Sequence, residues 1–293
     1  MEVSMERFLL ELELHGVAPS TLRLYRSVLQ RFEACLHTHG ATLESATPDT
    51  VMECFAARKR AGIKPTTLRT QGKILREYFK WAGKPEHARA IILPRAKRTV
   101  LPALTPSEVD AILRATGGRT WQRKRDHALI LLLLSTGLRI HEAHKLTVAD
   151  ASQDALLITG KGGKQRWVYI LPEVRRALES YLRAYTRQTG RTLQPHGPLW
   201  HTEHAPMSLA CMRAQIRAIG RRAGLPKHLG AHAFRRTFAT WSLRNGIDME
   251  HLRQLMGHSD YTVLRQYLAL DARDLKRAHE QHNPLNNLRN RKR

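Results

Sequence analysis

The segment IILPRAKRTVLP, residues 91–102, constrains the fold more than any other feature because it interrupts the helical patterning on either side of it. It contains two prolines, a basic cluster and no sustained hydrophobic period, which is typical of an interdomain linker. The length of 293 residues also exceeds what one hydrophobic core usually organises. We therefore predict two domains, residues 1–92 and 104–293, joined by a linker at residues 93–103.

The first domain is predicted to contain four short helices. They begin at Ser4, Pro19, Pro48 and Pro65, and in the second of them apolar residues recur at helical spacing before Gly40. In the fourth helix the side opposite the apolar residues carries four cations: Arg69, Lys73, Arg76 and Lys80. Helix starts with hydroxyls and free backbone N–H groups, PST and PTT, suit contact with a phosphate backbone. The alternative is an ordinary solvated face.

The second domain is predicted to be mainly α-helical with a small antiparallel β-sheet. Thr105, Pro106 and Glu108 have the pattern of a helix N-cap, first position and capping box. A buried helix in DHALILLLLS is followed by the turn STG and a second helix. The segment ALLITGKGGKQRWVYI is predicted to form a hairpin whose turn presents Lys161 and Lys164. The rest is expected to be helical except for a loop at residues 194–206.

Net charge indicates the class of partner. Lysine and arginine total 49 against 25 aspartate and glutamate, a formal net charge of +24. Residues 1–92 carry a net charge of +4 and the remainder +20. A polyanion, most simply double-stranded DNA, is the expected partner, although basic ribosomal and membrane-surface proteins share such totals.

Other classes of protein are disfavoured by composition. The longest apolar run, residues 128–134, is too short for a membrane span, and the N-terminus carries acids where a secretory signal would be basic. We expect a cytoplasmic protein. The cysteines Cys35, Cys54 and Cys211 form no CxxC pair, so we expect buried small hydrophobes rather than a zinc finger or a disulfide framework.

Several residues of the second domain could carry chemistry. Arg139 follows a glycine turn at a helix start, where its guanidinium and backbone N–H groups can converge on an anion. His232 and Arg235 are three apart on one helix face, and His258 follows the glycine that ends a helix at residues 248–256. Lys161 lies at the hairpin tip. Taken alone, each residue is better explained as an ordinary structural or solvated side chain. The sequence HEAH lacks the spacing of a zinc pair, and no Walker motif is present.

The set of motifs resembles the tyrosine recombinase (integrase) family, including the Xer-like recombinases. The resemblance is carried by LTPSEVDAIL, TGLRIHEAHKL, TGKGGKQRWVYI, HAFRRTFAT and LMGHSDYTVLRQYL in this order. It implies a helical SAM-like core-binding domain followed by a mixed α/β catalytic domain. Arg236 departs from the family pattern, in which a histidine often follows the second arginine.

The resemblance also implies a role for each matching residue. Tyr267, nine residues after His258, is the implied nucleophile, whereas Tyr261 keeps a packing role. Glu142 is expected to orient an arginine. The implied catalytic residues are Arg139, Lys161, His232, Arg235, His258 and Tyr267. The expected DNA contacts are Arg69, Lys73, Arg76, Lys164 and Arg166.

The activity implied by the resemblance is site-specific strand exchange. DNA would be cleaved through a 3′-phosphotyrosyl intermediate and exchanged through a Holliday junction, in integration, excision or resolution, without metal or ATP. A homotetramer is expected, with a C-terminal tail at residues 272–288 that contacts a neighbouring subunit or folds back on its own. The alternatives are a type IB topoisomerase, which shares this chemistry, and a DNA-binding regulator without catalysis.

Overall fold

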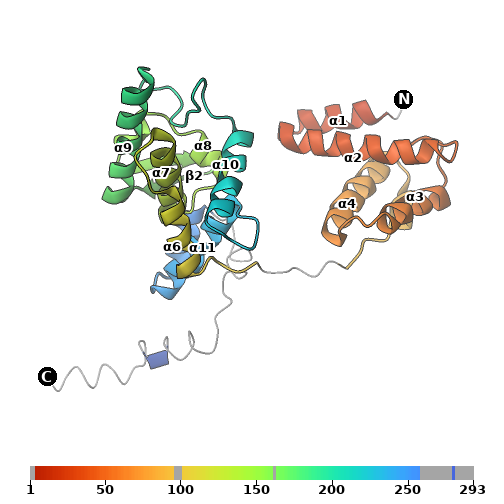
Figure 1. Ribbon diagram of the computed structural model, residues 1–293. Helices are drawn as coiled ribbons and strands as arrows, with labels where there is room; N and C mark the ends of the chain where they lie inside the picture. Colours follow the sequence, from red (N-terminus) through yellow and green to blue (C-terminus); the bar gives the residue numbers. More distant parts are fainter. Residues whose placement is uncertain (1–3, 96–100, 161–162, 258–278, 281–293) are drawn as a thin grey trace. The chain divides into compact units, whose positions relative to one another are not determined.

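The structure is a computed structural model that describes residues 4–95, 101–160, 163–257 and 279–280. The chain divides into two compact units, Met1–Thr99 and Val100–Arg293 (Figure 1). The first unit is entirely helical where it is described, and the second is helical with one small sheet. The predicted fold class, mainly α with a small antiparallel sheet, is confirmed.

The first unit contains one helix more than the sequence predicted. Its helices are α1 (Met5–Leu14), α2 (Pro19–His37), α3 (Pro48–Arg60), α4 (Pro65–Trp81) and α5 (Pro85–Ala90). The additional helix, α5, has only six residues, too few for a hydrophobic period to be visible. Tertiary contacts hold it: Nε2 of His87 lies 2.7 Å from the carbonyl oxygen of Ala46, and Ala88 is buried.

Aromatic side chains form the centre of the first unit. Phe8 of α1 packs edge-on against Tyr78 of α4, with ring centroids 5.4 Å apart, and also contacts Trp81. The indole of Trp81 donates to Oε2 of Glu11 at 2.6 Å. The apolar side of α4 is therefore buried, and its cationic residues are left toward solvent, since Arg69, Lys73 and Lys80 are exposed.

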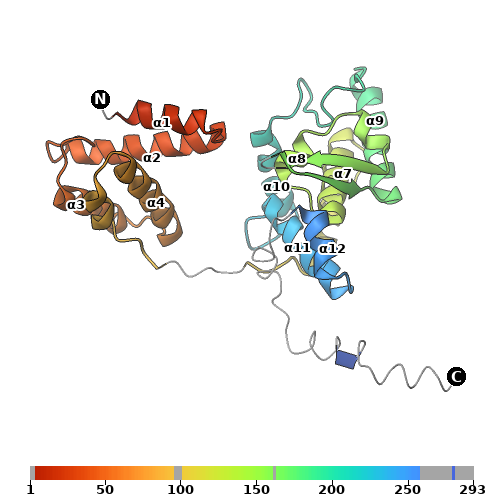
Figure 2. The same ribbon diagram turned by 180° about the vertical axis from the view of Figure 1, so that it is seen from behind.

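The second unit is built around α7. Its elements are α6 (Pro106–Thr116), α7 (Trp121–Thr136), α8 (Ile140–His144), the 3-10 helix η1 (Ala149–Ser152), β1 (Ala155–Thr159), β2 (Gln165–Tyr169), α9 (Pro172–Thr189), α10 (Leu209–Arg222), α11 (Ala231–Arg244) and α12 (Met249–Met256). Helix α7 contacts α6, α8, α9 and α11, and Figure 2 shows it behind the sheet. Its apolar residues from Ala128 to Leu133 are almost all fully buried, as expected of a helix that is apolar on every side.

Local signals of the second unit behave as predicted. The side chain of Thr105 accepts from the backbone N–H of Glu108, and the Glu108 carboxylate accepts from the backbone N–H of Thr105, which completes the capping box. The hairpin pairs β1 and β2 antiparallel, from Ala155 opposite Tyr169 to Thr159 opposite Gln165. Within the described residues, no helix combines the length and apolar composition that a membrane crossing requires.

Candidate active site

Arg139 is positioned by the sharp turn between α7 and α8. Gly137 ends α7 with φ +61°, a left-handed conformation that glycine adopts without steric cost. Arg139 then caps α8 with an extended backbone. Its backbone N–H donates to Oε2 of Glu142 at 2.8 Å, and its Nη1 donates to Oε1 at 3.1 Å. The Arg139 side chain remains 40% exposed, so the guanidinium can still meet a ligand.

Glu142 contacts a second arginine from the hairpin. Nη1 and Nη2 of Arg166 donate to its two carboxylate oxygens at 3.0 and 2.7 Å, and both side chains are buried. Burial raises the pKa of Glu142, but the hydrogen bonds from Arg166 and from the Arg139 backbone outweigh this and lower it to about 2. The carboxylate is therefore ionised at neutral pH and orients two guanidinium groups.

Arg166 does not lie where the sequence led us to expect it. We expected a DNA contact beside the hairpin turn, but the side chain points inward from β2 and is 8% exposed. Its Nε donates to the carbonyl oxygen of Leu255 at 2.9 Å, in addition to the Glu142 pair. Strand alternation explains the difference, because Arg166 shares the buried face of β2 with Val168. Arg166 thus ties β2 to α8 and to the end of α12.

Arg235 is the most deeply buried arginine of the described chain. It lies on α11, is 2% exposed, and donates from Nη1 to the carbonyl oxygen of Gly137 at 2.6 Å and from Nη2 to that of Met256 at 2.5 Å. These carbonyls belong to the segments that lead into Arg139 and into His258. Arg235 therefore fixes the ends of α7 and α12 near one another.

His232 lies one turn before Arg235 on α11 and is exposed. Desolvation lowers its pKa below the usual value, and repulsion from Arg236, Arg235 and Arg139 lowers it further. The imidazole is therefore under the influence of the positive charges of Arg139, Arg235 and Arg236. A neutral imidazole at neutral pH can accept a proton.

The remaining predicted catalytic residues, Lys161, His258 and Tyr267, lie outside the described residues, as do Tyr261 and most of the tail at residues 272–288. The structure describes residues on both sides of the hairpin tip that holds Lys161, and it describes the residue before His258. Gly160 donates its N–H to the carbonyl oxygen of Lys164 at 2.8 Å across the base of the hairpin turn. Gly257 ends α12 with φ +61°, one residue before His258, as the sequence predicted for this helix end.

The two histidines of HEAH have other partners. Nε2 of His144 lies 2.8 Å from the carbonyl oxygen of Met207, and Nε2 of His141 lies 2.8 Å from Nη2 of Arg213. Glu142 between them is held by arginines. His141 and His144 therefore contact different residues.

Cations of the first unit are divided between internal contacts and solvent. Nη1 of Arg69 donates to the carbonyl oxygen of Pro94 at 3.0 Å, and Nε of Arg76 donates to that of Ile91 at 2.9 Å. Lys73 is exposed on the same helix, and Lys164 is exposed in the second unit. Arg69 and Arg76, which are two of the expected DNA contacts, therefore also hydrogen-bond to the segment that follows α5.

Comparison with protein families decides the identity of the chain. Residues 102–273 match the family model for the phage integrase family, and residues 5–85 match that for the phage integrase N-terminal SAM-like domain. The chain belongs to the phage integrase family. The tyrosine recombinase resemblance predicted from the motifs is thereby confirmed, and the family supports site-specific recombinase activity.

Relatives of this integrase-family chain are similar over nearly its whole length. It is 32% identical over 286 residues to tyrosine recombinase XerC of Rhodospirillum centenum, covering 92% of this chain and 83% of the relative. It is 29% identical to tyrosine recombinase XerA of Pyrococcus furiosus, covering 97% of this chain and 95% of the relative. A crystal structure of the XerH site-specific recombinase bound to a palindromic difH substrate, a post-cleavage complex, has the same fold, with 21% identity, 90% and 80% coverage and a TM-score of 0.69.

Proposed function

We propose that this integrase-family protein cleaves and rejoins double-stranded DNA at a specific core site through a 3′-phosphotyrosyl intermediate, with Tyr267 as the nucleophile. One observation carries the proposal. Buried Arg235 donates to the carbonyl oxygens of Gly137 and Met256, so a single side chain brings together the segments leading to Arg139 and His258. The tie brings the two segments that carry the proposed catalytic residues into one site.

Arginines suit the charge that this reaction develops. Attack on a phosphodiester adds negative charge to the non-bridging oxygens in the five-coordinate transition state. The guanidinium groups of Arg139 and Arg235 offer planar donors that match this charge better than lysine would. Preorganised donors of this kind often supply the largest share of the rate enhancement. Glu142 supports them, since it fixes the Arg139 backbone and side chain.

The proton transfers of the reaction are assigned from the acid and base properties of the side chains. A tyrosine phenol has a pKa near 10 and needs a base or a cationic pocket to attack at neutral pH. His232, with its lowered pKa, is the proposed acceptor of the phenolic proton. Lys161 donates a proton to the leaving 5′ oxygen, and His258 hydrogen-bonds the scissile phosphate. The covalent linkage conserves the bond energy, so a 5′ hydroxyl can reseal the strand without a nucleotide cofactor.

The DNA partner and the assembly form part of the proposal. Solved relatives include a lambda integrase dimer bound to a core site, and the net charge of +24 suits a polyanion. We assign residues 1–92 to core-site binding, with Arg69, Lys73 and Arg76 on α4 and Lys164 in the hairpin as backbone contacts. Residues 104–293 form the catalytic domain. Four protomers exchange strands through a Holliday junction, joined by the tail at residues 272–288, on DNA in the cytoplasm.

A covalent trapping experiment tests the nucleophile. Full-length protein is incubated with a pool of nicked duplexes of randomised core sequence, denatured, and separated by gel electrophoresis to recover DNA that stays attached to protein. We expect an adduct with the wild type and with Tyr261→Phe, and none with Tyr267→Phe. An adduct that survives Tyr267→Phe would reject the assignment. Absence of an adduct from the wild type would favour a regulator without catalysis.

A second assay separates recombination from topoisomerase activity. A supercoiled plasmid without the recovered core sequence is compared with one that carries two copies of it. We expect strand exchange only in the second plasmid. Processive relaxation of the first plasmid would identify a type IB topoisomerase instead.

A further inference from the structure

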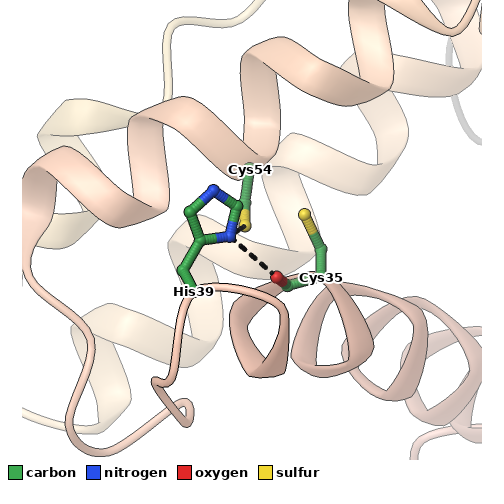
Figure 3. Close-up of side chains that lie close together, drawn as sticks. All are labelled: Cys35, His39 and Cys54. Carbon is green, nitrogen blue, oxygen red and sulfur yellow. Dashed lines mark hydrogen bonds between the residues drawn. The ribbon is translucent and has the colours of Figure 1, made fainter.

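Three side chains that are ligands of zinc-class metals meet in the first unit. Cys35 lies in the last turn of α2, His39 two residues after α2 ends, and Cys54 in the middle of α3. Their ligand atoms all lie within 4.8 Å of one another. In the described parts of the chain, no other group of three or more cysteine, histidine or acidic side chains converges in this way. Figure 3 shows the imidazole of His39 beside the sulfur of Cys54.

The spacing of these atoms fits a tetrahedral site. Nδ1 of His39 lies 3.7 Å from Sγ of Cys54. Zinc binds thiolate sulfur at about 2.3 Å and imidazole nitrogen at about 2.0–2.1 Å, so two such ligands at a tetrahedral angle lie about 3.6 Å apart. The pair is therefore already at the separation that a shared metal requires. Cys35 needs only a side-chain rotation or a small shift to complete the third position.

The surroundings of His39 also suit a metal ligand. Nε2, the ring nitrogen not directed at Cys54, lies 3.9 Å from Oε2 of Glu53. A histidine that binds a metal through one ring nitrogen usually donates the other N–H to a carboxylate, which fixes the tautomer and the ring orientation. In the structure Nδ1 lies 3.1 Å from the carbonyl oxygen of Cys35, to which it can only donate (Figure 3). Metal binding therefore requires the ring proton to move to Nε2, where a small movement of exposed Glu53 would accept it.

We propose that the first unit binds one Zn²⁺ ion through Sγ of Cys35, Nδ1 of His39 and Sγ of Cys54, with water in the fourth position. On binding, the two thiols release their protons, and the protein ligands displace water molecules from the ion. The ion would join the end of α2 to α3 and thereby fix the connection between them, residues 38–47. The proposal replaces our expectation that these cysteines are isolated small hydrophobes.

Cobalt is the probe for this site because Co²⁺ occupies zinc sites and reports thiolate ligands by absorption in the near ultraviolet. Reduced full-length protein is titrated with CoCl₂, and Zn²⁺ is then added in competition. We expect a thiolate-to-cobalt band and tetrahedral visible bands that saturate at one equivalent and disappear when Zn²⁺ is added. Metal analysis of protein purified without chelator should give one zinc per chain.

Matched variants locate the ligands. His39 is exposed, so His39→Gln should fold normally, as circular dichroism would verify, and should weaken Co²⁺ binding by more than ~10-fold. Cys54→Ala should remove most of the thiolate band. The controls are His37→Gln, an exposed histidine two residues away, and Cys211→Ser in the second unit, and both should bind Co²⁺ as the wild type does.

Three results would overturn the proposal. The first is a wild-type titration without a thiolate band. The second is equal loss of binding in His37→Gln and His39→Gln, which would indicate scattered histidines. The third is a disulfide between Cys35 and Cys54 in protein purified under reducing conditions, because it would remove both sulfur ligands.

Discussion

Arg166 of β2 and Glu142 of α8 form a buried bidentate ion pair in which Nη2 and Oε2 are 2.7 Å apart. The same carboxylate accepts from Arg139, whose guanidinium is half-exposed. The pair therefore connects the interior of the second unit to the residue that we assign to phosphate binding. A buried charge is costly unless it is paired, so each partner depends on the other.

Removal of the carboxylate should destabilise the second unit strongly. Glu142→Ala leaves Arg166 buried without its counter-charge, and we expect a loss of about 3–5 kcal/mol in the free energy of unfolding. Denaturant titration measures this change. The control is Glu179→Ala on α9, whose pair with Arg183 is exposed and should contribute at most about 1 kcal/mol. Equal effects of the two substitutions would contradict the role given to the buried pair.

Acid should remove the contribution of Glu142. Its pKa is about 2 in the folded protein, below the ordinary value of 4.5, so the folded state favours the ionised form. The stabilisation is fully present above pH 4.5 and is lost as the pH falls toward 2. We expect the difference in unfolding free energy between wild type and Glu142→Gln to shrink over this range. A difference that stays constant with pH would show that charge is not its source.

Gly137 should resist substitution more than other glycines of the same conformation. Its φ is +61°, and a Cβ built there would lie 2.5 Å from Cδ1 of Phe238. Gly137→Ala should therefore lose about 1–2 kcal/mol from backbone strain and about 1–3 kcal/mol more from overlap. Gly190 has φ +70° with open space around it, so Gly190→Ala isolates the strain. Thermal unfolding of the two variants should separate backbone strain from overlap with Phe238. Equal losses of stability in the two variants would contradict the contribution of overlap.

The lowered pKa of His232 predicts a particular pH profile. The pKa of the imidazole lies below its ordinary value of 6.5, so cleavage at limiting DNA concentration should fall in acid with a midpoint below pH 6.5. His232→Gln should reduce the cleavage rate by about 10²–10⁴-fold and abolish this acidic decline. A decline centred above pH 6.5 in the wild type would argue against His232 as the base.

Lys73 should contribute to DNA affinity without affecting stability. The side chain is exposed on α4, and a lost phosphate contact lowers the slope of log K against log salt by about 1. Fluorescence anisotropy with labelled core-site DNA at several salt concentrations measures the slope for Lys73→Ala. The control is Lys59→Ala, because Lys59 is an exposed lysine of α3 and is not one of the cations of α4. An unchanged slope for Lys73→Ala would remove the residue from the DNA-binding face.

Local signals in the sequence determined most of the secondary structure. Pro106 and the Thr105 capping box set the start of α6, Gly257 set the end of α12, and the β-rich runs on either side of the turn GKGGK predicted the hairpin. These signals act over a few residues, so they can be read without the fold. The six residues of α5 were missed because they are too few to show a hydrophobic period, although Pro85 at the first helical position marks their start.

Contacts between distant segments were decided only by the tertiary structure. The motif order identified the family and predicted a set of catalytic residues. It could not show that Arg166 turns inward to Glu142, 24 residues away, or that Arg235 reaches Gly137 and Met256. It also could not bring Cys35, His39 and Cys54 together, since that cluster depends on how α2 packs against α3. Burial and pairing depend on the whole fold, because each is a property of the space around a side chain.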